Sequence, residues 1–447
     1  MGTEPRQTSH RTRVPLLALV GANAVSMVGN VLANIAVPWF VLQTTGSAAR
    51  TGVVAFFAVL PAIVAGFLGG TVVDRLGYKR TSVIADLASG ITVAAIPLLY
   101  AHGTLEFWIL LALVFLGALL DAPGTTARSA LVPDVAGLAG TRLERASATM
   151  QAVQRGSLLL GAPLAGLLVT LIGTHNVLWL NAASFAVSAA MVALAVPSPA
   201  ADSVDTGEEQ PSGTYLGELL DGLRFIRRDR LVLTLVLTVM LTNFLDAPLF
   251  SVVMPVYAAR AFGSAVDLGL MVAAFGGGSL VGVVLYGVVG HKLSRRAAFA
   301  GAFVLAGLPF WALAMLPGLP VTVGALALSG LAAGPLNPII QTVGYERIPA
   351  HMRGRVFGAV TAGAYVAMPL GVLVAGYALE RIGISATLIA VAACYLVVTA
   401  SLFLNPALRE MDSLTTEEAE TVSVAMPSQE QGSIVTDAGA STGNDIP

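Results

Sequence analysis

Four charged side chains fall inside long apolar stretches of the sequence: Asp86, Asp121, Arg155 and Asp246. An ionisable group in such surroundings is costly unless it holds a proton, a ligand or a charged partner, so each is a candidate for function. The five histidines lie in tails or between apolar stretches, and the one cysteine, Cys394, lies within one. The sequence therefore predicts no histidine proton relay, disulfide framework, metal site or cofactor site.

Asp121 and Arg155 each stand seven or eight residues from the end of an apolar stretch. At 1.5 Å per residue both would lie about 10–12 Å deep in a helix, so they could pair. Such a pair could be a structural or gating ion pair, or it could take part in binding a substrate or a proton. Asp86 lies nearer its end, where we expect a loop arginine as its partner.

Asp246 stands about fifteen residues into its stretch, with no basic residue close by in sequence. A carboxyl group kept from water can carry a proton, which makes Asp246 a proton-coupling candidate beside Asp121. The alternative is a carboxyl group hydrogen-bonded to neighbouring helices. Asn30 occupies the matching depth in the first apolar stretch.

Composition shows what positions these groups. The 447 residues are 56% hydrophobic and only 11% charged, with a mean hydropathy of +0.80, whereas soluble domains average about 25% charged residues. Stretches of roughly 20 apolar residues are long enough to cross a bilayer as helices. We predict an all-α membrane protein with about twelve spans: 14–41, 49–73, 81–101, 106–127, 147–172, 176–196, 231–259, 266–290, 297–316, 321–343, 355–379 and 384–404. The first is too long for a cleaved signal peptide.

Lysine and arginine gather in alternate loops, on one side of the predicted membrane. Arg128, Arg142 and Arg145 are typical of that side, where we count them as loop residues. By the positive-inside rule both termini are cytoplasmic, and a net charge of −2 gives no argument for a nucleic-acid partner. The expected organisation is a cytoplasmic tail (1–13), a six-helix half (14–196), a cytoplasmic linker with an amphipathic helix (197–230), a second six-helix half (231–405) and a disordered cytoplasmic tail (406–447).

The two halves carry an internal repeat. The segment 38–80 aligns without gaps with 255–297, at an offset of 217 residues, and Gly46-Ser47-Ala48 then matches Gly263-Ser264-Ala265. Turns and basic loops fall in the same register. Repeats of this parallel kind place a binding site between the halves, near mid-membrane.

The loop after the second span reads Gly70-x-x-x-Asp74-Arg75-x-Gly77-Tyr78-Lys79-Arg80. This run resembles the signature motif of the major facilitator superfamily, with Tyr78 as its one departure. The chain over 14–405 also resembles the branch of macrolide-efflux and siderophore exporters, through stretches such as Ala36-Val37-Pro38-Trp39 and Gly161-Ala162-Pro163.

The resemblance implies twelve helices in two pseudo-symmetric six-helix halves, and export of a small organic molecule in exchange for protons. It also implies that Asp246 lies beside the transport pathway. Asp74 would meet the start of the eleventh span, near Arg353 and Arg355, and the motif residues Gly70, Arg75, Gly77 and Lys79 would complete this conformational latch. In the second half His291 replaces Asp74, so the latch is expected to be asymmetric.

We expect Asn30, Arg155, Trp39, Phe244 and Tyr257 to line the substrate cavity, although the aromatic residues could equally face lipid. No nucleotide-binding or catalytic motif is visible, so an enzyme is not expected. The expected partners are a small-molecule substrate, protons and the bilayer, for a monomer without cofactor. The alternatives are a proton-coupled importer and a non-transporting receptor or scaffold.

Overall fold

The computed structural model describes residues 12–197, 215–349 and 352–412. Within them, the side chains of 65–75, 215–216, 218–219 and 291 lie outside the description. All regular secondary structure of the described residues is helical. The linker 198–214 and most of both predicted tails lie outside the described residues.

Seven helices form the first bundle: α1 (Val14–Thr45), α2 (Ala48–Leu76), α3 (Tyr78–Ala101), α4 (Phe107–Ala130), α5 (Val132–Ala139), α6 (Leu143–Ile172) and α7 (Thr174–Ala195). After α8 (Tyr215–Arg228), the second bundle contains α9 (Arg230–Pro248), η2 (Leu249–Val253), α10 (Met254–Tyr257), η3 (Ala258–Phe262), α11 (Ala265–Val289), η4 (Gly290–Lys292), α12 (Arg295–Ala314), α13 (Leu319–Ala333), α14 (Leu336–Arg347), α15 (Arg353–Arg381), α16 (Gly383–Leu404) and η6 (Pro406–Arg409).

The predicted membrane spans agree with these helices. Eleven helical segments of the described chain are long and apolar enough to cross a membrane, and α2 adds an apolar helix over Ala48–Val64. Some spans join consecutive elements, such as α4 with α5 and α9 with η2, α10 and η3. Pro38, Pro61, Pro97, Pro123, Pro163, Pro309 and Pro369 lie inside helices, which membrane helices tolerate because neighbouring groups satisfy the freed backbone.

The internal repeat is visible at the helix starts. α2 begins at Ala48 and α11 at Ala265, and α3 and α12 also begin 217 residues apart. Gly46 and Gly263 both have positive φ, of 66° and 71°, which a residue without a Cβ adopts at little cost. Ser47 and Ser264 then each accept a hydrogen bond from the backbone N–H three residues on.

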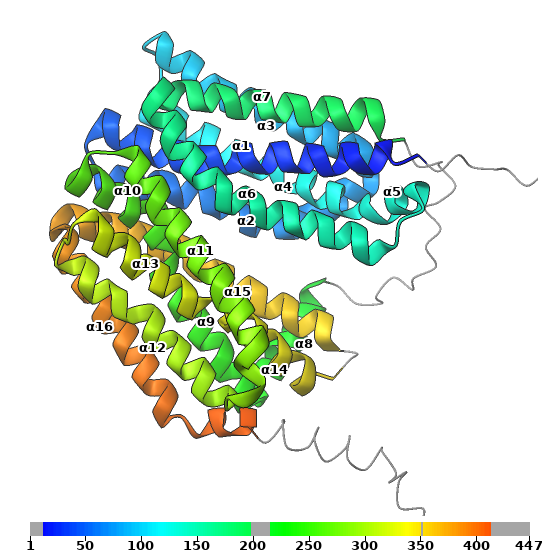
Figure 1. Ribbon diagram of the computed structural model, residues 1–447. Coiled ribbons are helices and arrows are strands. Elements are labelled where there is room, and N and C mark those ends of the chain that lie inside the picture. Colours follow the sequence, from blue (N-terminus) through cyan, green and yellow to red (C-terminus); the bar gives the residue numbers. More distant parts are fainter. Residues whose placement is uncertain (1–11, 198–214, 350–351, 413–447) are drawn as a thin grey trace, which may run out of the picture.

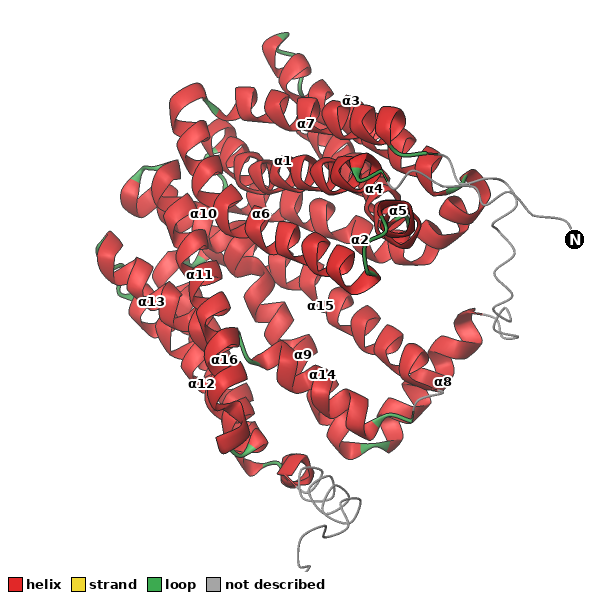
Figure 2. Ribbon diagram, turned by 45° about the vertical axis from the view of Figure 1, so that its right-hand side comes forward, coloured by secondary structure: helices red, strands yellow, loops and turns green. Residues whose placement is uncertain are grey.

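The two bundles meet at one end and diverge at the other (Figure 1). They meet near the starts of α2 and α11 and the ends of α6 and α15, which we call the closed end. They diverge toward α5 and α8, the open end, as the turned view in Figure 2 also shows. The polypeptide enters α1 at the open end.

Glycines allow the bundles to touch at the closed end. A Cβ on Gly52 of α2 would lie 2.8 Å from the Cα of Gly376 of α15. A Cβ on Gly166 of α6 would lie 2.4 Å from the carbonyl oxygen of Ala265 of α11. Small residues permit such close contact between membrane helices. The Ala48 N–H also donates to the Glu380 carboxylate at 2.8 Å, so one hydrogen bond crosses the interface.

At the open end α8 packs on α15. A Cβ on Gly222 would lie 2.5 Å from the carbonyl oxygen of Arg355, and Ile226 is buried. The predicted disordered tail begins too early, because Leu408 and Met411 are buried and Glu410 pairs with Arg347 at 2.9 Å. The chain is therefore packed as far as 412.

Candidate functional site

A cavity of about 1170 Å³ lies between the two bundles. Its walls are mostly Val, Leu, Ile and Ala side chains from α1, α2, α4, α6 and α11. Phe250 and Phe275 also line it and pack edge to face, with their ring centroids 4.7 Å apart. The polar and charged residues of the lining are few: Asn30, Asn34, Asp121, Thr125, Arg155, Asn181, Ser251 and Ser279. An apolar chamber with a few polar groups is typical of a small-molecule site.

Asp121 of α4 is the acidic residue of this lining. Its Oδ2 accepts a hydrogen bond from Nδ2 of Asn30 on α1 at 2.9 Å, while its buried Oδ1 has no hydrogen-bond partner among the described residues. The side chain keeps 18% of its surface exposed. Asp121 therefore lines the cavity with its Oδ2 hydrogen-bonded to Asn30 and its Oδ1 buried without a hydrogen bond to the described residues.

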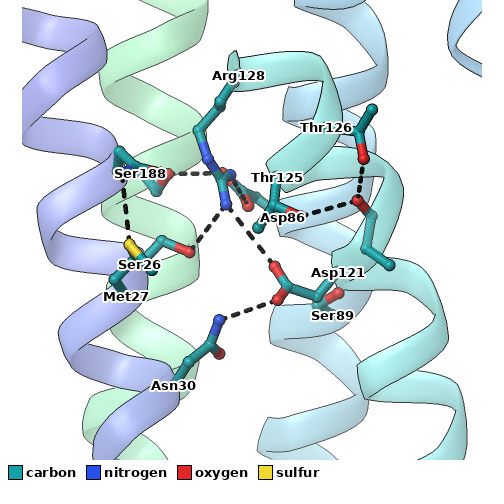
Figure 3. Close-up of polar contacts among 12 residues, drawn as sticks. Ser26, Met27, Asn30, Asp86, Ser89, Asp121, Thr125, Thr126, Arg128 and Ser188 are labelled. Carbon is teal, nitrogen blue, oxygen red and sulfur yellow. Dashed lines mark hydrogen bonds and ion pairs between the residues drawn. The ribbon is translucent and has the colours of Figure 1, made fainter. Parts of the chain in front are cut away.

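Behind Asp121 lies a buried arginine (Figure 3). Arg128 of α4 pairs with Asp86 of α3 at 2.6 Å, and neither side chain is exposed. The second Asp86 oxygen accepts from Ser188 at 2.6 Å, and Arg128 also donates to Ser26 at 3.3 Å. The guanidinium of Arg128 reaches Asp121 only at 3.8 Å. We call Asp86, Asp121 and Arg128 the charge cluster.

Small residues bring α3 and α4 together around this cluster. A Cβ on Gly124 would lie 2.9 Å from the Ala85 Cβ, and Ser89 donates to the carbonyl oxygen of Gly117 at 3.2 Å. Arg128 lies one turn after Gly124 on α4, and Asp86 directly follows Ala85 on α3. The close approach of the two helices therefore removes both charged groups from water.

Arg155 lines the same cavity from α6, as predicted, but it does not pair with Asp121. Its side chain is exposed, and it makes no ion pair with the described residues. Equal depth in two helices placed the residues at one level without giving the direction of either side chain. The expected Asp121–Arg155 pair is therefore wrong, and Arg128 is the arginine nearest to Asp121.

Asp246 of α9 lies in the second bundle and not in the cavity wall. Its carboxylate accepts a hydrogen bond from the Tyr395 hydroxyl of α16 at 3.3 Å. The Tyr395 ring packs against Phe303 and Phe310. Asp246 was expected beside the pathway, but its side chain lies on the face of α9 that is turned toward α16.

The three aromatic residues expected in the cavity wall lie outside it. Trp39 and Tyr257 are core residues with 4% and 1% of their surface exposed, and Phe244 packs against the same core. Phe250 and Phe275 line the cavity instead. Helices that are apolar on all faces give no periodic signal for which face is buried, so the choice of aromatic residue was wrong.

The predicted latch is only partly described. The side chains of Asp74 and Arg75 and the surroundings of Gly70 lie outside the description. Gly77 forms the turn between α2 and α3 with φ of 78°, and Lys79 lies in the first turn of α3.

The arginines of the predicted latch contact their own bundle and α8. Arg353 donates to the carbonyl oxygens of Ile348 and Tyr345, and Arg355 lies 3.8 Å from Asp221 of α8. These contacts join the start of α15 to α14 and to α8.

Arg128 is the residue that sequence reasoning missed, since it was counted as a basic residue of a cytoplasmic loop. The helix continues beyond the predicted end of the fourth span to Ala130, and Arg128 is fully buried in its last turn. The prediction that Asp86 pairs with an arginine is right, but that arginine lies inside the bundle. Its spacing of seven residues from Asp121, two helical turns, was the available signal.

Two repeated bundles of membrane-crossing helices around a shared cavity define a multi-pass membrane transporter. The chain belongs to the Major Facilitator Superfamily, whose family model matches residues 19–249 and 236–436. It is 33% identical over 404 residues to the multidrug efflux pump Tap of Mycolicibacterium fortuitum, covering 90% of this chain and 98% of that protein. It is 23% identical over 366 residues to macrolide efflux protein A of Streptococcus pyogenes, covering 81% and 88%.

Solved structures share the fold at low sequence identity. The nucleoside transporter NupG aligns with a TM-score of 0.73 at 14% identity, over 87% of this chain and 98% of that one. A bacterial homolog of the human lysosomal transporter Spinster, in an inward-facing and unoccupied conformation, aligns with a TM-score of 0.69 at 15% identity, over 92% and 99%. These likenesses concern the fold alone.

Proposed function

We propose that this chain exports a small amphipathic organic molecule, of the kind met as drugs, antibiotics or secondary metabolites, in exchange for protons. The transporter is a monomer in the cell's inner membrane, with both termini in the cytoplasm. The open end then faces the cytoplasm, and the conformation described above is inward-open. Substrate enters from the cytoplasm and leaves after the bundles rock against each other.

The observation that carries this proposal is the cavity between the bundles. A chamber of about 1170 Å³ with aliphatic walls suits an amphipathic compound of drug size. Its few polar groups would orient the compound without matching it closely. The printed names of two relatives, a multidrug efflux pump and a macrolide efflux protein, support export of such compounds.

Asp121 is the proposed group for proton coupling in the cavity. It lines the cavity, is shielded from bulk water, and stands next to a buried arginine. Proton and substrate can therefore reach the same carboxylate from the same space. Asp246, which accepts a hydrogen bond from the Tyr395 hydroxyl, is the proposed second proton-carrying group. It would act within the second bundle.

The motif that covers the end of α2, the turn at Gly77 and the start of α3 is proposed to lock the open end when the transporter turns outward. α15 begins at Arg353, so its N-terminal backbone N–H groups would attract the carboxylate of Asp74. Gly70, Arg75, Gly77 and Lys79 shape and charge that turn. In the inward-open state Arg353 and Arg355 are instead held by α14 and α8.

Drug accumulation in cells tests the proposal. Expressed in a bacterial host that lacks its own major efflux pumps, the chain should lower the accumulation of radiolabelled erythromycin or of ethidium. A protonophore should abolish the difference, and Asp121→Asn should lack it at equal expression. Accumulation equal to that of the empty host for a broad panel of compounds would contradict export.

The rival function is proton-coupled import on the same fold. It predicts that expression raises the accumulation of a compound while the protonophore lowers it. A receptor or scaffold predicts no change in either direction.

A further inference from the structure

The charge cluster contains two carboxylates and only one arginine. Asp86 and Arg128 are fully buried and 2.6 Å apart, while Arg128 and Asp121 are 3.8 Å apart. Ser188 holds the second oxygen of Asp86. The arginine is thus neutralised by Asp86, and one negative charge remains on Asp121, which faces the cavity.

We propose that Asp86 is a positioning residue for proton coupling. Because Asp86 pairs with Arg128, the negative charge of Asp121 is not balanced by that arginine. Asp121 therefore becomes neutral only by binding a proton or a positively charged group of the substrate. The inference rests on the proposed function and adds a residue that does not touch the cavity. Burial gives the reason, because an unbalanced charge in a low-dielectric surrounding is strongly disfavoured.

The surroundings of Asp121 leave few other groups to set this balance. Among the described side chains, the charged ones near it are Asp86 from α3 and Arg128 from α4, and Arg155 from α6 lines the same cavity. Arg50 of α2 lies over the Phe107 ring, at the opposite end of α4.

The helices α1 and α7 present uncharged polar groups near the cluster, namely Ser26, Asn30 and Ser188. These groups can donate or accept hydrogen bonds but cannot change the charge. The charge count of the cluster is therefore set by three residues.

Removing one charge should change the proton affinity of Asp121 in a direction fixed by the count. In Asp86→Asn, Arg128 is left to balance Asp121, the cluster is neutral without a proton, and protonation moves to lower pH. In Arg128→Gln two carboxylates face each other, and protonation moves to higher pH. The double variant Asp86→Asn/Arg128→Gln again carries one negative charge.

The test is an infrared pH titration of the full-length protein in lipid, with the proton itself as probe. The signal is the C=O stretch of the protonated carboxyl group, taken as the component that Asp121→Asn removes. We expect the midpoint to fall by about one pH unit or more in Asp86→Asn and to rise by about as much in Arg128→Gln. The double variant should return to within a few tenths of the parent.

A purely structural Asp86 predicts another pattern, in which the double variant departs from the parent at least as far as the worse single variant. That result would overturn the inference, as would equal midpoints in all four proteins. Thermal unfolding in detergent reports folding of each variant. If Asp86→Asn does not fold, a parent-like midpoint in a folded double variant supports the charge count, and a double variant that also fails to fold contradicts it.

The proposed function can fail separately. If the parent shows drug export that Asp121→Asn keeps, Asp121 is not the coupling group, and this inference falls with that part of the proposal. If Asp121 is required but the midpoints do not follow the charge count, only the role of Asp86 is wrong.

Discussion

Arg128 is shared unequally by two aspartates that differ in their access to the cavity. Asp86 is fully buried and makes the short ion pair, whereas Asp121 keeps 18% of its side-chain surface exposed. A buried ion pair is weak evidence for stabilisation, because desolvation of both charges offsets their attraction. The exposed partner is the one that can exchange protons or ligands with the cavity.

Asp121 and Asp246 differ in their place relative to the cavity, so substitution of each tests a different property. Asp121→Asn should remove substrate-driven proton movement in proteoliposomes, because an amide cannot take up the proton. Asp246→Asn should leave ethidium binding within about twofold, a change of less than 0.5 kcal/mol, because Asp246 does not line the cavity. Fluorescence titration and a pH-sensitive dye measure the two effects. Proton movement that survives Asp121→Asn would contradict its assignment.

Arg155 should govern selectivity more than stability. It is exposed and makes no ion pair with the described residues, so Arg155→Gln should change the free energy of unfolding by less than about 0.5 kcal/mol. Loss of its positive charge should weaken the binding of anionic compounds and strengthen that of cationic ones. Binding of a matched anionic and cationic dye measures this, and equal changes for both would contradict an electrostatic role.

Two glycines in different surroundings give predictions about the stability of helix packing. Gly124→Ala adds a Cβ 2.9 Å from the Ala85 Cβ, while Gly301→Ala of α12 meets nothing within 4 Å. The first should cost about 1–3 kcal/mol through overpacking of α3 against α4. The second should be neutral or stabilising by up to about 1 kcal/mol. Denaturation in mixed micelles compares them, and equal stabilities would show that α3 and α4 yield easily.

The hydrogen bond between Ala48 and Glu380 joins the bundles at the closed end. A carboxylate at the N-terminus of α2 is stabilised by the helix dipole, by about 0.3–1 kcal/mol. Glu380→Gln should therefore open this end roughly two- to fivefold more often.

Spin labels on α2 and α15, in a variant without Cys394, would report the change as a larger population of long distances. Glu106→Gln, an exposed glutamate at the start of α4, is the matched control. Identical distance distributions in all three proteins would contradict a role for Glu380 in closure.

Much of the architecture could be predicted from sequence, because the bilayer imposes a local rule. Every span needs about 20 apolar residues, so hydropathy alone gave the helices, and the repeat gave the matching turns at Gly46 and Gly263. Asp121, Asn30 and Arg155 were also predicted to be at the site, since polar groups are rare in such helices.

Side-chain direction could not be predicted in the same way. Helices that are apolar all round carry no periodic mark of their inner face, so Trp39 and Tyr257 were assigned to a cavity that they do not reach. Helix ends are uncertain by one or two residues, and that hid Arg128 in a supposed loop. Pairing depends on rotation about both helix axes, which depth along the chain does not give.

The two bundles share one cavity but contribute different residues to the proposed transport. Most of the cavity's polar and charged lining comes from the first bundle, whereas Asp246 and Tyr395 lie within the second. At the closed end α2 contacts α15 and α6 contacts α11. Rocking about these contacts would expose the same chamber to either side of the membrane in turn.

Uptake into inverted membrane vesicles tests proton-driven export most directly. With the vesicle interior acidified, labelled erythromycin or ethidium should accumulate inside vesicles that contain the chain, and an uncoupler should release it. Vesicles with Asp121→Asn at equal expression should accumulate no more than empty ones. Uptake that ignores the proton gradient, or that occurs only in right-side-out vesicles, would contradict the account.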